Sequence, residues 1–183
     1  MKTHPTTLPG VQLFELDSFG DARGRFMETF RRDRYRELGI DLEFVQDNFS
    51  ASARDVVRGL HYQLQFPQGK LVHVVQGAVF DVAVDIRRGS PTFAQWFGTE
   101  LSADNHHQLW IPPGFAHGFV ATSESAMVCY KVTANYAPAD ERAIAWNDPQ
   151  LAIRWPLAGE PTLSGRDSKA LRLADAELPQ FRS

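Results

Sequence analysis

The feature that most limits what this chain can fold into is a succession of short apolar stretches, rich in Val, Phe and Trp and separated by Gly and Pro. Such stretches at close spacing favour a β-sandwich or a β-barrel. Helical signals are weak, with short candidates at residues 31–38, ended by Gly39, and at 170–178. We expect strands at residues 11–16, 26–30, 44–50, 56–64, 70–75, 78–86, 94–101, 108–111, 118–121 and 127–133.

Length and charge narrow the class of protein. The 183 residues suit one domain. Within it, we expect residues 1–50 to contribute to a dimer and residues 138–183 to wrap the barrel. The net charge of −3 excludes a strongly basic nucleic-acid binder. The apolar runs are too interrupted to span a membrane, and the N-terminus lacks the apolar stretch of a signal peptide. The single cysteine, Cys129, favours a reducing, cytoplasmic location, and its apolar neighbours predict a buried core thiol.

The clearest local pattern is a hairpin predicted over residues 70–86, turning at Gln76–Gly77. Strict alternation of side chains then gives the hairpin two faces. Lys70 and Asp81 share one face with small apolar residues, which indicates either a polar pocket inside the barrel or a plain ion pair on a solvated face. The other face is mostly apolar, so we expect one face to line the barrel and the other to form a homodimer interface.

Two stretches have the spacing of a metal-binding cupin barrel, but the ligand set is changed. His61 and His117 stand at ligand positions, whereas Gln63 and Lys70 replace a His and a Glu. Because a protonated lysine cannot ligate and repels cations, no metal is expected, and the ammonium group suits the stabilisation of an oxyanion. His106 and His107 are adjacent, so on a strand they face opposite sides and do not form a metal pair.

Seven segments in order make the resemblance specific. Together they are similar to the dTDP-4-dehydrorhamnose 3,5-epimerase family over residues 21–167, nearly the whole chain. The resemblance implies an all-β fold, a cupin-like jelly-roll barrel with a few short peripheral helices, that is usually dimeric and uses no metal or organic cofactor. The segments are DARGRFME (21–28), RGLHYQ (58–63), PPGFAHGF (112–119), YKVT (130–133), YAP (136–138), WNDP (146–149) and LSGRD (163–167).

The family converts dTDP-4-dehydro-6-deoxy-D-glucose into dTDP-4-dehydro-L-rhamnose, a precursor of bacterial surface polysaccharide. The C4 ketone acidifies the hydrogens at C3 and C5, so epimerisation needs a base, an enolate stabiliser and an acid on the opposite face. The resemblance implies His61 as base, oriented by Asp167, with Lys70 at the enolate oxygen and Tyr130 as proton donor. Asp81 would keep Lys70 charged.

The same resemblance implies a set of residues that handle the dTDP-sugar. Cations would meet the diphosphate, with one arriving from a partner subunit, and an aromatic ring would stack on the thymine. Arg166 stands where many relatives have Lys. The set is Arg23, Phe26, Glu28, Gln46, Asp47, Asn48, Arg58, Gln63, Asp81, His117, Tyr136, Glu141 and Arg166.

The sequence leaves open how Arg58 and His61 reach one pocket, and it leaves three alternative functions. Alternation puts Arg58 and His61 on opposite faces, unless a bulge at Gly59 turns both toward one pocket. The rivals are a single-carbon epimerase or ketoisomerase of another deoxysugar, a metal-dependent cupin enzyme, and a binding protein without catalysis.

Overall fold

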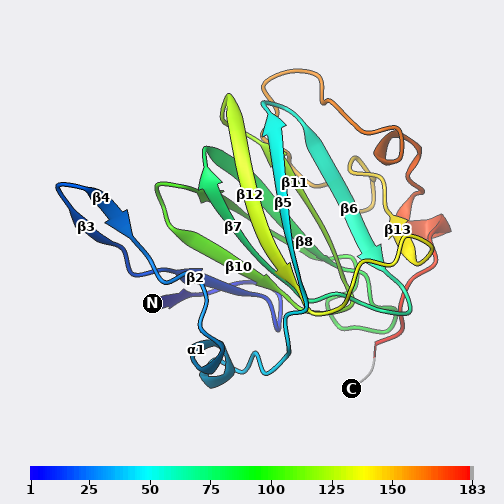
Figure 1. The fold of residues 1–183 in the computed structure, drawn as a ribbon. Helices are drawn as coiled ribbons and strands as arrows, with labels where there is room; N and C mark the ends of the chain where they lie inside the picture. Colours follow the sequence, from blue (N-terminus) through cyan, green and yellow to red (C-terminus); the bar gives the residue numbers. More distant parts are fainter. Residues whose placement is uncertain (182–183) are drawn as a thin grey trace.

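The computed structural model describes residues 1–181 as two antiparallel sheets packed face to face (Figure 1). The six-stranded sheet has the order β1-β2-β10-β7-β12-β5 and the five-stranded sheet the order β13-β6-β11-β8-β9, both counted within the described residues. The strands of the first sheet are β1 (Lys2–His4), β2 (Gln12–Glu15), β5 (Gln46–Ala53), β7 (Lys70–Gln76), β10 (His107–Ile111) and β12 (Ser125–Val132). Those of the second are β6 (Val57–Gln63), β8 (Ala78–Asp85), β9 (Trp96–Ser102), β11 (Phe115–Ala121) and β13 (Glu141–Ala143).

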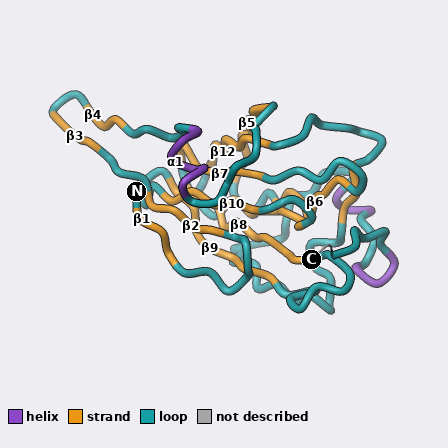
Figure 2. Tube along the Cα trace, turned by 90° about the horizontal axis from the view of Figure 1, so that it is seen from below, coloured by secondary structure: helices purple, strands orange, loops and turns teal. Residues whose placement is uncertain are grey.

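A small hairpin and a short helix complete the N-terminal part. Strands β3 (Phe19–Asp21) and β4 (Gly24–Phe26) pair only with each other in the described structure and stand out from the body (Figure 2). Helix α1 (Arg32–Glu37) follows, as predicted. The expected strand at 26–30 is largely wrong, because β4 ends at Phe26. No helix of the described part is long and apolar enough to cross a membrane.

The main core lies between the two sheets. Val72 on β7, Val79 and Ala83 on β8, and Leu101 on β9 are buried together, with Leu109 on β10. These side chains come from alternate positions of strands in both sheets, which is how a sandwich closes around its interior. The all-β, cupin-like barrel expected from the sequence is confirmed.

The hairpin predicted at residues 70–86 is wrong. Strand β7 pairs with β10 and β12, whereas β8 pairs with β11 and β9, so the chain crosses between sheets at Gly77. Gly77 has the positive φ of a turn residue, 71°, and a Cβ there would lie 2.1 Å from the Ser125 carbonyl oxygen. The expected division into faces nevertheless holds, because Val72, Val79 and Ala83 all point into the core.

Part of the second face of these strands is covered by the chain itself, and the rest of it, such as Val75 on β7, is exposed. Leu71 packs under the segment around α1, against Tyr35 and Trp110. Val82, Val84 and Ile86 of the other sheet are covered by apolar residues of the C-terminal segment, such as Ile144. Figure 1 shows that segment, orange to red, along the side of β6 and β13.

Two further expectations fail for local reasons. The helix predicted at 170–178 is replaced by the 3₁₀ turns η1 (Asp167–Lys169) and η2 (Leu173–Asp175), because backbone groups there bind distant partners; the Leu173 N–H, for example, donates to Asp148. Cys129 is half-buried on the outer face of β12, not in the core, because alternation points Val128 and Tyr130 inward and Cys129 outward. The last two residues of the predicted wrapping segment lie outside the described residues.

Candidate active site

A cavity of about 360 Å³ opens between the two sheets. Strands β5, β7 and β12 supply one wall, strands β6 and β11 the other, and residues 136–141 form part of the rim. Ten of the predicted site residues line it: Gln46, Asn48, Arg58, His61, Gln63, Lys70, His117, Tyr130, Tyr136 and Glu141. The open choice between a polar pocket and a solvated ion pair is thereby decided, because Lys70 and Asp81 are both buried.

His61 and Asp167 form a close polar pair at the wall of the cavity. His61 Nε2 lies 2.5 Å from Asp167 Oδ1, and the two side chains are 27% and 2% exposed. Burial raises the pKa of Asp167, but the hydrogen bond and charge of His61, together with bonds from Ser164 and the Gly59 backbone, bring its pKa below the ordinary value. A carboxylate held in this way fixes the orientation of the imidazole and stabilises its protonated form.

A bulge in β6 brings Arg58 and His61 to the same cavity. On β11, His117 pairs with His61 and Phe119 with Arg58, so three steps along β6 match two along β11. Gly59 takes up the extra residue with a φ of 119°, and a Cβ there would lie 2.6 Å from the Cα of Gly118. The predicted bulge is therefore confirmed, since only glycine fits at this close approach.

Ionisable side chains from both sheets are buried beside the cavity. His117 Nε2 lies 2.9 Å from Asp81 Oδ2, and Asp81 is fully buried. Burial lowers the pKa of Lys70 to about 8, although the charge of Asp81 opposes this shift. Lys70 is therefore protonated at neutral pH, and it places an ammonium group on a wall of the cavity.

Tyr130 faces His61 from the other sheet. Tyr130 lies on β12 and His61 on β6, and both line the cavity. Burial raises the pKa of Tyr130, with the charge of Arg58 acting in the opposite direction, so the phenol is protonated at neutral pH. A neutral phenol opposite an imidazole provides a proton donor and a proton acceptor on the two sides of one space.

The rim is held by side-chain amides and charges. Gln46 Oε1 accepts the Tyr136 N–H at 2.8 Å, and Gln63 binds backbone groups of two loops. The Tyr136 hydroxyl donates to Glu141 Oε2 at 2.8 Å, and Arg166 forms an ion pair with Glu141. Gln63 thus lines the cavity but uses its amide to hold loops, and Arg166 lies beside the rim.

Some predicted residues are not brought to this cavity. Arg23 and Phe26 lie on the projecting β3–β4 hairpin, and Glu28 binds Arg31 and Arg34 nearby. Asp47 lies on the outer face of β5, ion-paired to Lys131. Asp81 and Asp167 stand behind His117 and His61 and are hydrogen-bonded to them.

The cavity also contains residues that the sequence analysis missed: Phe49, Ser50, Tyr62, Gln68 and Phe119. Ser50 Oγ is buried and has no hydrogen-bond partner among residues 1–181. Alternation along β5 was a signal for it, since Gln46, Asn48 and Ser50 share one face. The donor set suits an anion better than a cation, because Lys70 is an ammonium group and the Gln63 amide is occupied.

Comparisons with known proteins agree with this arrangement. A family model described as dTDP-4-dehydrorhamnose 3,5-epimerase matches residues 5–175. The dTDP-4-dehydrorhamnose 3,5-epimerase of Pseudomonas aeruginosa is 54% identical over 178 residues, which cover 97% of this chain and 98% of that protein. A dTDP-4-dehydrorhamnose 3-epimerase of Streptomyces niveus is 43% identical over 178 residues, covering 96% and 86%.

Solved structures are similar over the same span. The crystal structure of a dTDP-6-deoxy-D-glucose-3,5-epimerase from Legionella pneumophila, in complex with dTDP-4-keto-L-rhamnose, matches with a TM-score of 0.98 and 50% identity. The match covers 100% of this chain and 99% of that one. Because sequence and structure agree through the whole barrel and the cavity inside it, this chain belongs to the dTDP-4-dehydrorhamnose 3,5-epimerase family of isomerases.

Proposed function

We propose that this protein epimerises dTDP-4-dehydro-6-deoxy-D-glucose at C3 and C5 to give dTDP-4-dehydro-L-rhamnose. The observation that carries the proposal is the placement of the His61–Asp167 pair on one wall of the cavity and of Tyr130 and Lys70 on the other. A reaction that removes a proton from one face of a sugar and returns one to the opposite face needs this arrangement.

The proposed chemistry proceeds through an enolate. His61 takes the proton next to the C4 ketone, and Asp167 stabilises the imidazolium that forms. The Lys70 ammonium group stabilises the negative charge on the C4 oxygen, and Tyr130 returns a proton from the opposite face. Each proton removed is balanced by one returned, so the product is an isomer and no redox partner is needed.

Binding of the nucleotide would use the cations and the rim of the cavity. Arg58 and Arg166 would contact the diphosphate, and Tyr136 would stack on the thymine ring. Gln46 and Asn48, adjacent on one face of β5, would contact the thymidine. The unpartnered hydroxyl of Ser50 beside them supports a polar ligand at this wall.

A homodimer that shares its sites is the next part of the proposal. The β3–β4 hairpin carries Arg23 and the exposed Phe19 and Phe26, which are 65% and 69% exposed. Exposed Phe49 and Val75 on the outer face of the six-stranded sheet offer apolar surface for a second copy. We propose that Arg23 and Phe26 of one protomer reach the cavity of the other. We also propose that the protein works in the cytoplasm.

Subunit complementation tests this sharing. Arg23→Ala and His61→Asn protomers would each be inactive alone, but mixing them after mild dissociation would restore activity, because one cavity of the mixed dimer would be intact. Mixtures that stay inactive while mixed dimers form would contradict a site shared between protomers.

Proton exchange tests the reaction itself. The chelator-treated protein is incubated with dTDP-4-dehydro-6-deoxy-D-glucose in deuterated water and followed by NMR. Deuterium at both C3 and C5, with the L-configured product, is the expected result. Label at one carbon only would support the second candidate, a single-site epimerase, which the similarity to the Streptomyces niveus 3-epimerase favours. No label at either carbon would refute both.

A further inference from the structure

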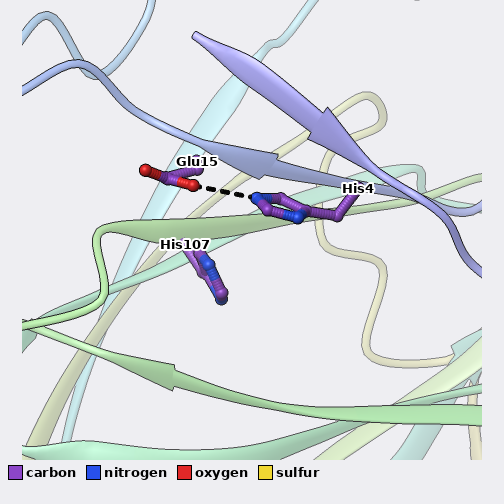
Figure 3. Close-up of side chains that lie close together, drawn as sticks. All are labelled: His4, Glu15 and His107. Carbon is purple, nitrogen blue, oxygen red and sulfur yellow. Dashed lines mark hydrogen bonds and ion pairs between the residues drawn. The ribbon is translucent and has the colours of Figure 1, made fainter.

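A cluster of two histidines and one glutamate lies on the strands β1, β2 and β10 of the six-stranded sheet, away from the cavity. His4, Glu15 and His107 come from the neighbouring strands β1, β2 and β10, as Figure 3 shows. One potential ligand atom from each lies within 4.8 Å of the other two. His107 begins β10, whereas Ile111 at the other end of that strand pairs with Lys70, so the cluster is separate from the cavity.

The register explains why these three side chains meet. Glu15 stands opposite Lys2 on β1 and opposite His107 on β10, and His4 is two residues beyond Lys2. Glu15 and His107 therefore share the interior side of the sheet with Leu13 and Leu109, which belong to the core. His106, with a positive φ of 56°, makes its contact with Arg25 instead.

Two of the three side chains already share a hydrogen bond. His4 Nε2 lies 3.0 Å from Glu15 Oε2, and an ion about 2.0–2.2 Å from both atoms would take the place of that bond. His107 Nδ1 is buried and has no hydrogen-bond partner among residues 1–181, so it is available to a ligand. Lys2 donates to Glu15 Oε1, so Glu15 Oε2 is engaged only by His4, the other proposed ligand.

The cluster offers one potential ligand atom from each of its three side chains. A neutral imidazole offers the lone pair that a metal needs. Two imidazoles and one carboxylate are a donor set that Zn²⁺ and similar ions prefer.

We propose that His4, Glu15 and His107 bind a divalent transition-metal ion of the Zn²⁺ type, which ties β1 to β2 and β10. Strand β1 is an edge strand that pairs only with β2 in the described structure, so a metal would fasten the start of the chain to the barrel. The ion would take no part in chemistry at the cavity. This inference does not depend on the proposed function.

Calorimetric titration with ZnCl₂ tests the site, using chelator-stripped protein without a histidine tag. We expect one saturable site per chain in the native protein. His4→Gln and His107→Gln should each weaken binding by more than about tenfold, since even groups outside the ligand set have effects of that size. His106→Gln is the matched control and should bind as the native protein does, and all three variants should keep their turnover.

A second measurement covers the case in which a variant folds poorly. NMR of the native protein should show the ring signals of His4 and His107 shifting with added Zn²⁺, while those of His106 stay. Shifts confined to His61, equal binding by all three variants, or no saturable binding would each overturn the proposal.

Discussion

The interior of this barrel has two halves that differ in what they bury. In the apolar half, Leu101, Leu109 and Val79 are fully buried among other hydrocarbon side chains. In the polar half, Lys70, His117 and Asp81 are almost as deeply buried but are ionisable. Burial of hydrocarbon contributes about 25 cal/mol per Å² to stability, whereas burial of a charge costs free energy unless it is paired. One half therefore stabilises the fold, and the other holds the ionisable groups that chemistry in the cavity needs.

The largest effect should come from His61→Asn, which removes the base and keeps a polar side chain of similar size. We expect turnover and proton exchange at both carbons to fall by about 10³-fold, the range for a general base. Binding of dTDP and the melting temperature should change little. A variant that still exchanges protons at the native rate would remove His61 from its role as base.

A substitution in the apolar half should lower the stability of the fold and leave turnover unchanged. Leu101→Ala leaves a cavity in the core, and we expect the free energy of unfolding to fall by about 3 kcal/mol, while turnover per folded molecule is kept. Leu101→Met is the control, with a loss under about 1.5 kcal/mol, because it preserves volume. Denaturant titration measures both. If Leu101→Ala lowered turnover as strongly as His61→Asn, the division into two halves would fail.

Tyr130→Phe separates two steps within the polar half, the removal of a proton and its return. The ring still packs against its neighbours, but the donated proton is lost. We expect completed inversion to fall by about 10²-fold while deuterium exchange at the face of His61 persists. Exchange and product formation are followed in the same NMR sample, and inversion at the native rate would show that another group donates the proton.

The smallest effect concerns pH. Since the pKa of Lys70 is lowered to about 8, turnover should fall above that pH by about tenfold per unit, as the ammonium group becomes neutral. Lys70→Arg should move this limb upward, because a guanidinium stays charged. A profile that is flat from pH 8 to 10 in the native protein would contradict the role of Lys70.

The same titration has a consequence for stability. The folded protein releases the Lys70 proton near pH 8, whereas the unfolded chain keeps it to about 10.5, so the unfolded state binds more protons between these values. This group therefore makes the free energy of unfolding rise with pH across that window.

Much of the fold could be read from local patterns. Alternation placed Val72, Val79 and Ala83 on the core side, and Gly39 marked the end of α1, because side-chain direction and backbone conformation depend on near neighbours. Strands β1, β3 and β13 escaped notice, since three residues are too few to show a period. The helix expected at 170–178 failed because distant groups compete for its backbone hydrogen bonds.

The class of fold, the family and most of the residues that line the cavity could be predicted from the sequence alone, since these follow from alternation and from motifs in order. Strand pairing in three dimensions places β7 and β8 in different sheets, lets Gly59 turn Arg58 and His61 to one side, and brings His4, Glu15 and His107 together. The physical reason is that pairing between strands is non-local. A glycine turn looks the same whether the chain folds back on itself or crosses to the other sheet, and the choice depends on which distant strands offer the free edge.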